Sequence, residues 1–499
     1  MGIKSTLTAP LSFLLSSMVE KNAQTAINCQ NYWRNKLIQK AQNTLFGQEH
    51  GFSEIKNYTD FQSRIPVRDY EQLQPYIKKV YTGEENVLWP GKPLYFAKTS
   101  GTTSGTKYIP ISKDSISNHF NSARDAMMLY SRQSGNFKYA DGKLVYLSGS
   151  PVLEKTNGIF TGRLSGIVNH HIPSWWRSNQ MPSYEINCIE DWEEKVDRIA
   201  AESIGQDIRL VSGIPPWVQM YFDKLIEKTG KNIRQLFPNF SVLVHGGVNF
   251  EPYKAKLFQT IGDMVDTVET FPASEGFIAY QYRPNLPGML LNVNSGIFFE
   301  FVPLSEISSP NPKRYSLAEV ETGVNYAIII NSNAGLWGYN LGDTVRFSSL
   351  NPPLLTVTGR VKHYISAFGE HVIAEEVEHA LLSVAHELGI RITEFTVAPF
   401  IGQHEFEKSC HQWFVEFDEV PAELSKLAEL VDLALQQKNV YYSDLIKGNI
   451  LRPLEIIPLQ NGAFRDYMKS VGKLGGQNKV PRLSNNRLIA EALMPYKTN

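Results

Sequence analysis

The sequence predicts an α/β protein with a large multi-sheet N-terminal domain and a smaller α+β C-terminal domain. Between residues 92 and 359, short apolar runs rich in β-branched and aromatic residues alternate with helical stretches, which is typical of buried sheets covered by helices. After residue 360 the order changes to a helix over 374–388, two strands, and a helix over 422–437. A chain of 499 residues is too long for one core, so we expect domains at 1–360 and 361–499.

The individual elements follow from local patterns. The chain up to about Gly91 is expected to be mostly helical. Runs such as KLVYL at 143–147 and NYAIIIN at 325–331 are apolar and indicate strands. The helix over 374–388 has Val377, Ala380, Leu381 and Val384 at helical spacing. Further strands are expected at 94–97, 241–244, 265–271, 288–301, 391–397 and 412–417, and further helices at 191–201, 217–228 and 253–261.

Composition argues against several classes of function. Lys and Arg total 49 against 50 Asp and Glu, whereas a dedicated nucleic-acid-binding protein carries an excess of basic residues. A neutral protein can still hold a small anion, such as a nucleotide, in a locally basic pocket. The three cysteines are far apart, lack metal-ligand spacing and do not make a disulfide framework. We therefore expect a reducing, cytoplasmic setting and no nucleic-acid partner.

The N-terminus carries an apolar segment that needs separate treatment. The first six residues fit the loose pattern for N-myristoylation, and residues 11–19 are mildly apolar. This segment is too short to span a bilayer and is interrupted by Ser16 and Ser17. We expect an N-terminal helix that packs on the body of the protein, and no membrane helix elsewhere.

The strongest local signal is a loop rich in glycine and hydroxyl side chains, from Lys98 to Lys107. It follows an apolar strand that ends at Ala97. Glycines let the backbone approach a ligand closely, and successive backbone N–H groups, hydroxyls and a lysine make a phosphate cradle. A plain surface loop is the alternative. A P-loop is excluded because Gly105 is followed by Thr106 before the lysine, so the pattern Gly-Lys-Ser/Thr is not met.

Residues 99–107 resemble the first core motif, TSGTTGxPK, of the adenylate-forming superfamily. That superfamily includes acyl-CoA synthetases, firefly-type luciferases and peptide-synthetase adenylation domains. The resemblance implies that the loop binds the phosphates of ATP and that Lys107 acts in catalysis. The nucleotide-binding residues that it implies in this loop are Ser100, Gly101, Thr102 and Thr103.

A second segment, residues 271–276, is similar to the Tyr-Gly-x-Thr-Glu motif of the same superfamily. Mg²⁺ takes few protein carboxylates and shares phosphate oxygens. The resemblance therefore implies that Glu275 is the metal ligand and that Ser274 contacts the phosphate. The alternative is a strand-to-helix corner whose glutamate lies in the first helical turn, where the helix dipole favours it.

Two further segments resemble the ribose-binding parts of the superfamily. Residues 338–343 are similar to the Tyr-x-Thr-Gly-Asp motif, with Leu341 in place of the threonine, and Asp343 is suited to bind two ribose hydroxyls. Residues 358–378 resemble the interdomain hinge, and the resemblance implies that Arg360 contacts the ribose. The alternatives are an aspartate in a turn and an ordinary loop that leads into an amphipathic helix.

The hinge departs from the superfamily pattern at its acidic pair, which Lys362 and His363 replace. A glycine pair within residues 245–252 also has a counterpart, because in relatives this strand end walls the adenine. The resemblance implies that Gly247 and Val248 do so here. The alternative is a plain strand-to-helix turn, where glycine pairs are common.

The particular form of these motifs narrows the resemblance to one branch. The loop SGTTSGTKYIPIS, the form Ala-Ser-Glu-Gly at 273–276 and Gly-Tyr-Asn-Leu-Gly-Asp at 338–343 are similar to the auxin-responsive (Gretchen Hagen type) acyl acid amido synthetases. The resemblance covers nearly the whole chain and reaches residues 475–482. It implies that a mobile C-terminal domain brings Lys479 to the nucleotide phosphate, where a lysine charge can face the developing pyrophosphate.

The function that the resemblance implies is an ATP- and Mg²⁺-dependent ligase. It adenylates a carboxylic acid to acyl-AMP and transfers the acyl group to an amine, with an amino acid as the expected acceptor. An acyl-CoA ligase of the same fold, a non-catalytic nucleotide-binding protein and a structural protein are the alternatives. The acid, the acceptor and the oligomeric state stay open. Aromatic and apolar residues that either line the acid pocket or belong to the core are Trp175, Trp176, Trp217, Met220 and Tyr221.

Overall fold

The computed structural model describes the chain as two compact units. The residues outside the description are 1, 103–104, 173–176, 248–249, 285, 308, 362–363, 366, 371, 403–406, 472–479 and 499. Unit 1 comprises Met1–Thr102, Thr106–Glu190 and Glu194–Val361, and unit 2 comprises Thr103–Gly105, Asp191–Glu193 and Lys362–Asn499. The division of the chain at residue 360 into domains with separate roles stays a prediction.

Unit 1 is built on a sheet of eleven described strands in the order β12-β13-β14-β15-β11-β10-β9-β8-β7-β3-β6. The strands from β9 to β6 run parallel, whereas β9 pairs antiparallel with β10 and the remaining pairs are antiparallel. The strand bounds are β3 Lys143–Tyr146, β6 Gln180–Met181, β7 Ile208–Ser212, β8 Val242–Gly246, β9 Asp266–Ala273, β10 Gly276–Gln281, β11 Met289–Leu291, β12 Ile297–Pro303, β13 Asn325–Ser332, β14 Tyr339–Leu350 and β15 Pro353–Arg360.

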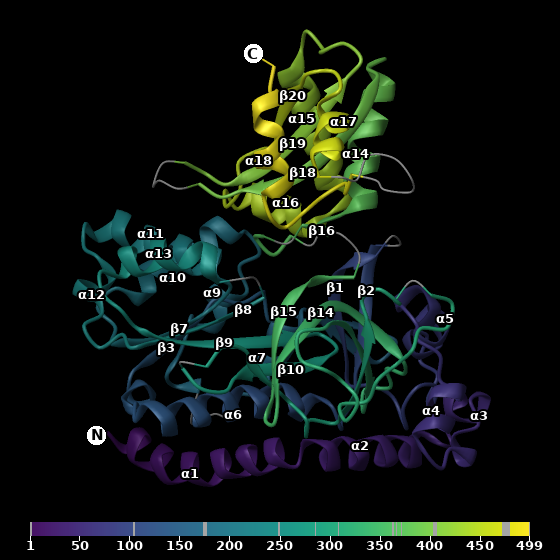
Figure 1. The fold of residues 1–499 in the computed structure, drawn as a ribbon. Helices are drawn as coiled ribbons and strands as arrows, with labels where there is room; N and C mark the ends of the chain where they lie inside the picture. The colour runs from purple at the N-terminus through teal and green to yellow at the C-terminus, as the bar shows by residue number, and fades with distance from the viewer. Residues whose placement is uncertain are drawn as a thin grey trace. The chain divides into compact units, whose positions relative to one another are not determined.

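The parallel half of this sheet is covered on both faces. Figure 1 shows α11, α12 and α13 on one face and α6 on the other. This covering explains why the strands are continuous apolar runs rather than alternating ones, since both side-chain directions are buried. For example, Leu144 and Val145 are adjacent in β3, and both are fully buried. The helix bounds are α6 Ile116–Ser134, α11 Pro215–Thr229, α12 Ile233–Leu236 and α13 Glu251–Ile261.

A smaller sheet of unit 1 has the order β2-β1-β5-β4. β1 pairs parallel with β5, and β5 pairs antiparallel with β4. Its strands are β1 Tyr95–Thr102, β2 Gly105–Ile111, β4 Glu154–Thr156 and β5 Ile159–Gly162. The other described helices that begin before residue 204 are α1 Ile3–Gln24, α2 Ala26–Ala41, α3 Leu45–Glu49, α4 Tyr58–Arg64, α5 Tyr70–Tyr81, α7 Leu164–Asn169, α9 Tyr184–Asn187 and α10 Trp192–Ser203, with 3₁₀ turns η1 Phe52–Glu54 and η2 Lys138–Asp141.

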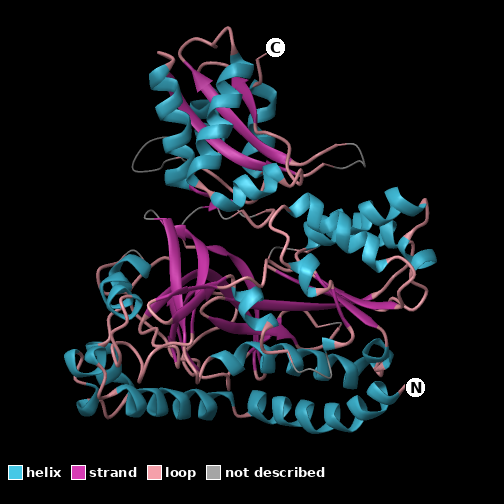
Figure 2. Cartoon of the chain, turned by 180° about the vertical axis from the view of Figure 1, so that it is seen from behind, coloured by secondary structure: helices cyan, strands magenta, loops and turns pink. Residues whose placement is uncertain are grey.

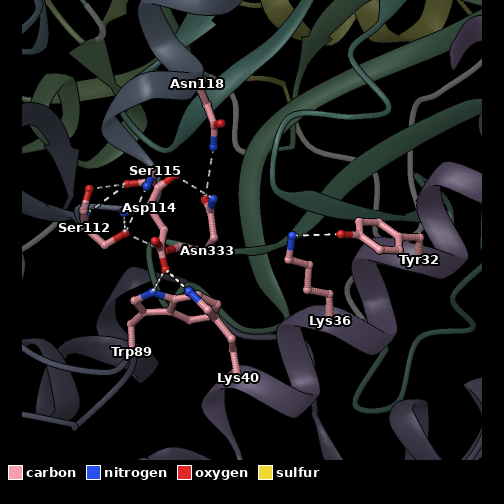
Figure 3. Close-up of polar contacts among 9 residues, drawn as sticks. All are labelled: Tyr32, Lys36, Lys40, Trp89, Ser112, Asp114, Ser115, Asn118 and Asn333. Atoms are coloured by element: carbon pink, nitrogen blue, oxygen red, sulfur yellow. Dashed lines mark hydrogen bonds and ion pairs between the residues drawn. The ribbon is translucent and has the colours of Figure 1, made fainter.

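Helices α1 and α2 form the outermost layer of unit 1, with α1 packed on α6 and α2 on β12 (Figures 1 and 2). A polar network fixes α2 to the body (Figure 3). Asp114 Oδ2 accepts hydrogen bonds from Lys40 Nζ at 2.7 Å and from Trp89 Nε1 at 3.1 Å, and Asn333 Nδ2 donates to the Asp114 carbonyl oxygen at 3.0 Å. Partial burial opposes ionisation of Asp114, but the hydrogen bonds from Lys40 and Trp89 hold its pKa below the usual value.

Unit 2 contains a three-stranded sheet in the order β18-β19-β20, with β18 antiparallel and β20 parallel to β19. Its core includes Trp413 and Val415 of β19 together with Val377 and Leu381 of α14. The elements are β16 Tyr364–Ile365, β17 Val372–Ile373, α14 Ala374–Glu387, β18 Ile392–Phe400, β19 Cys410–Phe417, α15 Leu424–Lys438, α16 Val440–Lys447, β20 Glu455–Leu459, α17 Ala463–Ser470, α18 Leu488–Leu493 and η3 Met494–Tyr496.

Candidate active site

The carboxyl ends of the parallel strands in unit 1 form one edge of the large sheet, where ligands bind in open α/β sheets. At this edge Gly246 of β8 pairs with Thr270 of β9. A Cβ at position 246 would lie 2.2 Å from the Thr270 carbonyl oxygen, so only glycine fits. Gly247 follows with a φ of 82°, in the left-handed region. The end of β8 therefore carries no side chain at positions 246 and 247. Val248 lies outside the described residues.

A buried imidazole backs this strand end. The ring of His245 stacks on the ring of Phe250, with centroids 4.0 Å apart and an interplanar angle of 15°. Burial lowers the pKa of His245 to about 4, so the ring is uncharged at neutral pH. The pair is a flat apolar support beside Gly247.

Glu275 lies at the tip of a β-hairpin. Residues 274 and 275 form the turn between β9 and β10, and Gly276 pairs with Ala273 across it. The alternative of a strand-to-helix corner is therefore wrong, and no helix dipole accounts for the glutamate. Glu275 is half-buried, and its Oε1 accepts a hydrogen bond from Tyr339 Oη at 3.1 Å. Ser274 adjoins it and is also half-buried.

Two tyrosines connect Glu275 with the lysine of the glycine-rich loop. Lys107 Nζ of β2 lies 5.5 Å from the centroid of the Tyr70 ring, and Tyr70 Oη accepts a hydrogen bond from the Tyr108 backbone N–H at 2.9 Å. Burial raises the pKa of Tyr339 well above its usual value, and the negative charge of Glu275 raises it further. Burial is the largest cause of the raised pKa of Tyr70, and the charges of Glu71 and then Glu275 add to it. Lys107 thus lies over one tyrosine and Glu275 is bonded to another, and the charge of Glu275 acts on both tyrosines.

Asp343 and Arg360 meet across two neighbouring strands. Asp343 of β14 is the Cα partner of Arg360 of β15, and Thr344 is that of Gly359. Asp343 is nearly buried and lies in a strand, so the alternative of an aspartate in a turn is wrong. The ladder places the backbones of the two expected ribose-binding residues side by side, while the side chain of Arg360 lies outside the description.

The glycine that begins this motif has a steric reason to be there. Gly338 has a φ of 58°, and a Cβ on it would lie 2.2 Å from the Pro66 carbonyl oxygen. The Arg68 backbone N–H donates to the Gly338 carbonyl oxygen at 2.7 Å, and the Asn340 N–H donates to the Arg68 carbonyl oxygen at 2.7 Å. These contacts fix the entry into β14 and thereby the position of Tyr339.

Replacing Gly338 by alanine is expected to lower the free energy of unfolding by about 3 kcal/mol or more, because strained φ and a backbone clash act together. Gly323→Ala is the matched control, since Gly323 has a φ of 82° but a Cβ on it would meet no atom within 4 Å. It should cost about 1 kcal/mol. Urea denaturation of both variants measures the difference, and equal losses would contradict the account.

Several expected residues cannot be placed. Thr103 and Lys479 lie outside the described residues. Of Ser100, Gly101 and Thr102 only the backbone is described, as part of β1. In the described part of the chain, no three His, Cys, Asp or Glu side chains gather as a metal cage. A Mg²⁺ site that shares phosphate oxygens needs fewer protein ligands, and the half-buried carboxylate of Glu275 fits a single ligand of this kind.

The structure adds two residues to the candidate site and assigns one candidate of the acid pocket to the core. Tyr70 and Tyr339 were not among the expected site residues, although Tyr339 lies inside the quoted motif at 338–343. Tyr221 is fully buried and donates a hydrogen bond to Ser203 Oγ at 2.8 Å, so it belongs to the core. Trp175 and Trp176 lie outside the described residues.

Comparison with known proteins defines the class first. The fold matches an acyl acid amido synthetase in complex with 2,4-DB, with a TM-score of 0.63, 15% identity, and coverage of 98% of this chain and 96% of that one. It also matches a 2-hydroxyisobutyryl-CoA ligase in complex with 2-HIB-AMP and CoA, with a TM-score of 0.60, 13% identity, and coverage of 95% and 91%. The chain therefore has the fold of adenylate-forming ligases, which confirms the expected α/β fold class.

Family models then identify the chain. The GH3 family N-terminal domain matches residues 16–181 and 150–265, the central domain matches 290–360, and the C-terminal domain matches 375–488. The chain belongs to the GH3 family, as its motifs predict.

The relatives of known activity are distant in sequence, but they align with most of this chain. A jasmonoyl–L-amino acid synthetase of Nicotiana attenuata is 23% identical over 63% of this chain and 66% of its own length. An indole-3-acetic acid-amido synthetase of Arabidopsis thaliana is 21% identical over 88% of this chain and 87% of its own.

No helix in the described part of the chain is both long and apolar enough to cross a membrane.

Proposed function

We propose that this protein is an ATP-dependent acyl acid amido synthetase, which converts a carboxylic acid to acyl-AMP and passes the acyl group to the amine of an amino acid. The observation that carries the proposal is the cluster of Lys107 and Glu275 around Tyr70 and Tyr339. A cation on β2 of the small sheet and a carboxylate just after β9, a parallel strand of the large sheet, match the needs of a nucleoside triphosphate. Family membership supports the same activity.

The first half-reaction joins the acid to AMP. A carboxylate oxygen of the acid attacks the α-phosphorus of ATP, and the bond from that phosphorus to the bridging oxygen of pyrophosphate breaks. Lys107 faces the negative charge that gathers on the leaving group. Glu275 would hold Mg²⁺, with Ser274 beside the phosphate, and the bound ion would neutralise phosphate charge. Asp343 and Arg360 hold the ribose, and Gly247 and Val248 wall the adenine.

The second half-reaction transfers the acyl group. The amine nitrogen attacks the acyl carbonyl carbon, loses a proton, and AMP leaves with the carbon–oxygen bond electrons. We propose that residues 361–499 act as a mobile domain, so that Lys479 acts during adenylation and gives way to the acceptor. This part rests on the resemblance of residues 475–482. The free cysteines Cys29, Cys188 and Cys410 support a cytoplasmic setting.

Tyr339 is a positioning residue in this scheme, because its hydroxyl donates a hydrogen bond to Glu275 and acts through that carboxylate. Tyr339→Phe is expected to raise the Mg²⁺ concentration for half-maximal activity about tenfold, which corresponds to about 1.4 kcal/mol. Tyr326→Phe is the control, since Tyr326 Oη accepts a hydrogen bond from the Glu321 backbone N–H at 3.0 Å, away from the cluster. An unchanged Mg²⁺ dependence in Tyr339→Phe would remove this role.

Product analysis tests the acceptor. The fold does not distinguish amide formation from CoA ligation, because an amido synthetase and a CoA ligase both have it. The protein is incubated with ATP, Mg²⁺ and aryl, indole or fatty acids, with either the twenty amino acids or CoA, and the products are identified by mass spectrometry. We expect an N-acyl amino acid and AMP. A CoA thioester without any amide would overturn the amide step.

A further inference from the structure

A buried carboxyl group on β12 joins several segments of unit 1. Glu300 is fully buried, and its Oε1 accepts a hydrogen bond from Tyr58 Oη of α4 at 3.1 Å. Its Oε2 accepts hydrogen bonds from the Arg314 guanidinium at 3.3 Å and from Asn331 Nδ2 at 3.0 Å. Burial raises the pKa of Glu300, whereas the charge of Arg314 and the hydrogen bonds from Asn331 and Tyr58 lower it. The three described partners all donate, as suits a carboxylate.

Asn331 connects this carboxyl group with the motif at residues 338–343. Asn331 belongs to β13 and is fully buried. Its Oδ1 accepts a hydrogen bond from the Gly338 backbone N–H at 2.7 Å, while its Nδ2 donates to Glu300. A backbone N–H only donates, so the amide oxygen must face Gly338 and the amide nitrogen must face Glu300. An ionised aspartate of the same size could not donate, and a leucine could do neither.

The hydrogen bond to Gly338 bears on the position of Tyr339. The Gly338 carbonyl oxygen accepts from the Arg68 backbone N–H at 2.7 Å, so Asn331 and Arg68 hold the two polar groups of this glycine. The next residue, Tyr339, donates from its Oη to Glu275 Oε1 at 3.1 Å. A continuous path therefore runs from Asn331 through Gly338 and Tyr339 to Glu275. Small displacements along such a path are costly at a site that must hold its groups in one geometry.

We propose that Asn331 is a positioning residue for Glu275: its amide ties the Gly338 turn to the buried Glu300 and thereby holds Tyr339 Oη against the Glu275 carboxylate. The proposal rests on the proposed function, in which Glu275 holds Mg²⁺. Asn331 acts through the backbone of Gly338, and therefore its loss should change the requirement for Mg²⁺ rather than the binding of the acid.

Asn331→Asp tests this role, because it keeps the size of the side chain and can still accept from Gly338. It no longer donates to Glu300 and places a second carboxyl group beside it. We expect the Mg²⁺ concentration for half-maximal ATP–pyrophosphate exchange to rise about tenfold, with the KM for the acid within about twofold of the wild type. Isothermal titration with ATP at varied Mg²⁺ concentration, without acid, should show the same rise in the absence of turnover.

Tyr58→Phe is the matched control. It also removes a hydrogen bond to the Glu300 carboxyl group, but from Oε1, the oxygen that Asn331 does not contact. The Mg²⁺ dependence of this variant should equal that of the wild type. Asn331→Ser is the second test variant, because it removes the amide without adding a charge beside Glu300, and it should shift the Mg²⁺ dependence in the same direction as Asn331→Asp.

Two combined variants separate positioning from general damage to the fold. Asn331→Asp together with Glu300→Gln exchanges donor and acceptor, because the new amide at position 300 can donate to the new carboxylate at position 331. This pair should recover most of the lost Mg²⁺ affinity. Asn331→Asp together with Tyr339→Phe should be no worse than the worse single variant, since residues on one path do not act additively.

Melting temperatures show which variants are folded. A folded Asn331→Asp or Asn331→Ser with the Mg²⁺ dependence of the wild type would overturn the proposal, and so would losses that multiply in the combination with Tyr339→Phe. Either result leaves the proposed function intact as long as the wild type catalyses exchange. A wild type that catalyses no exchange with any acid would overturn the proposed function, and the role of Asn331 would fall with it.

Discussion

Glu275→Gln is expected to lower acid-stimulated ATP–pyrophosphate exchange by about 10²–10³-fold. The substitution keeps the shape of the side chain and can still accept the hydrogen bond from Tyr339 Oη. It removes the negative charge that the proposed Mg²⁺ site requires. Exchange rates at saturating ATP and acid measure the loss, while an unchanged melting temperature shows that the fold is intact.

Glu154→Gln is the matched control for this loss. Glu154 belongs to the small sheet of the same unit and pairs with Lys98 at 2.6 Å, but it is 71% exposed and lies outside the cluster. Exposed ion pairs contribute little to stability, so this variant should keep wild-type exchange. If Glu275→Gln kept the wild-type rate of exchange, the proposal that Glu275 holds Mg²⁺ would be wrong.

Lys107→Met should have an effect of similar size. The substitution keeps an unbranched apolar side chain that can still lie over the Tyr70 ring, but it removes the cation that faces the leaving pyrophosphate. We expect about a 10²-fold fall in kcat for exchange with a smaller change in the KM for the acid, because the charge matters most in the transition state. Steady-state exchange at varied acid concentration separates the two constants.

Lys98→Met provides the comparison within the same motif. Both lysines flank the glycine-rich loop, yet Lys98 pairs with Glu154 whereas Lys107 lies at Tyr70. Lys98→Met is expected to leave exchange within about twofold of the wild type. If the two variants lost activity equally, a general effect of positive charge on the loop would replace the specific role of Lys107.

The pattern of apolar runs predicted three of the five described strands in the parallel half of the sheet, because a strand buried on both faces is a continuous apolar run; β6 and β7 were not expected. The runs at 143–147, 241–244 and 265–271 correspond to β3, β8 and β9. The antiparallel half was harder to predict. The run at 288–301, expected as one strand, is β11 and β12 with a turn between them.

The ladder of β14 and β15 was not expected as strands at all. β14 contains Gly342 and Asp343, which are residue types depleted in strands, and its register depends on pairing with β13 and β15. Such pairing joins residues that are far apart in the chain, so the local sequence of β14 does not reveal it. The same holds for Tyr70, because a tyrosine on the buried side of an amphipathic helix has the same local pattern as a core residue.

The motifs named candidate site residues, but they did not predict the secondary structure in which those residues lie. Glu275 and Asp343 were expected from the superfamily patterns, but each pattern alone also allowed a helix corner or a turn. Only the pairing of β9 with β10 and of β14 with β15 excludes those alternatives. The side of α1 that faces inward was likewise not predicted. Ser12 and Ser16 are buried whereas Leu7 and Leu14 are exposed, and a mildly apolar segment with serines does not indicate which side packs on the protein.

The most direct test of the central claim is ATP–pyrophosphate exchange by the wild type with a panel of aryl, indole and fatty acids and no acceptor. Acyl-AMP formation is reversible, so labelled pyrophosphate should enter ATP only when a suitable acid is present. We predict that one class of acid stimulates exchange and that Glu275→Gln abolishes the stimulation. ATP binding without exchange for every acid in the panel would contradict the adenylation chemistry proposed for Lys107 and Glu275.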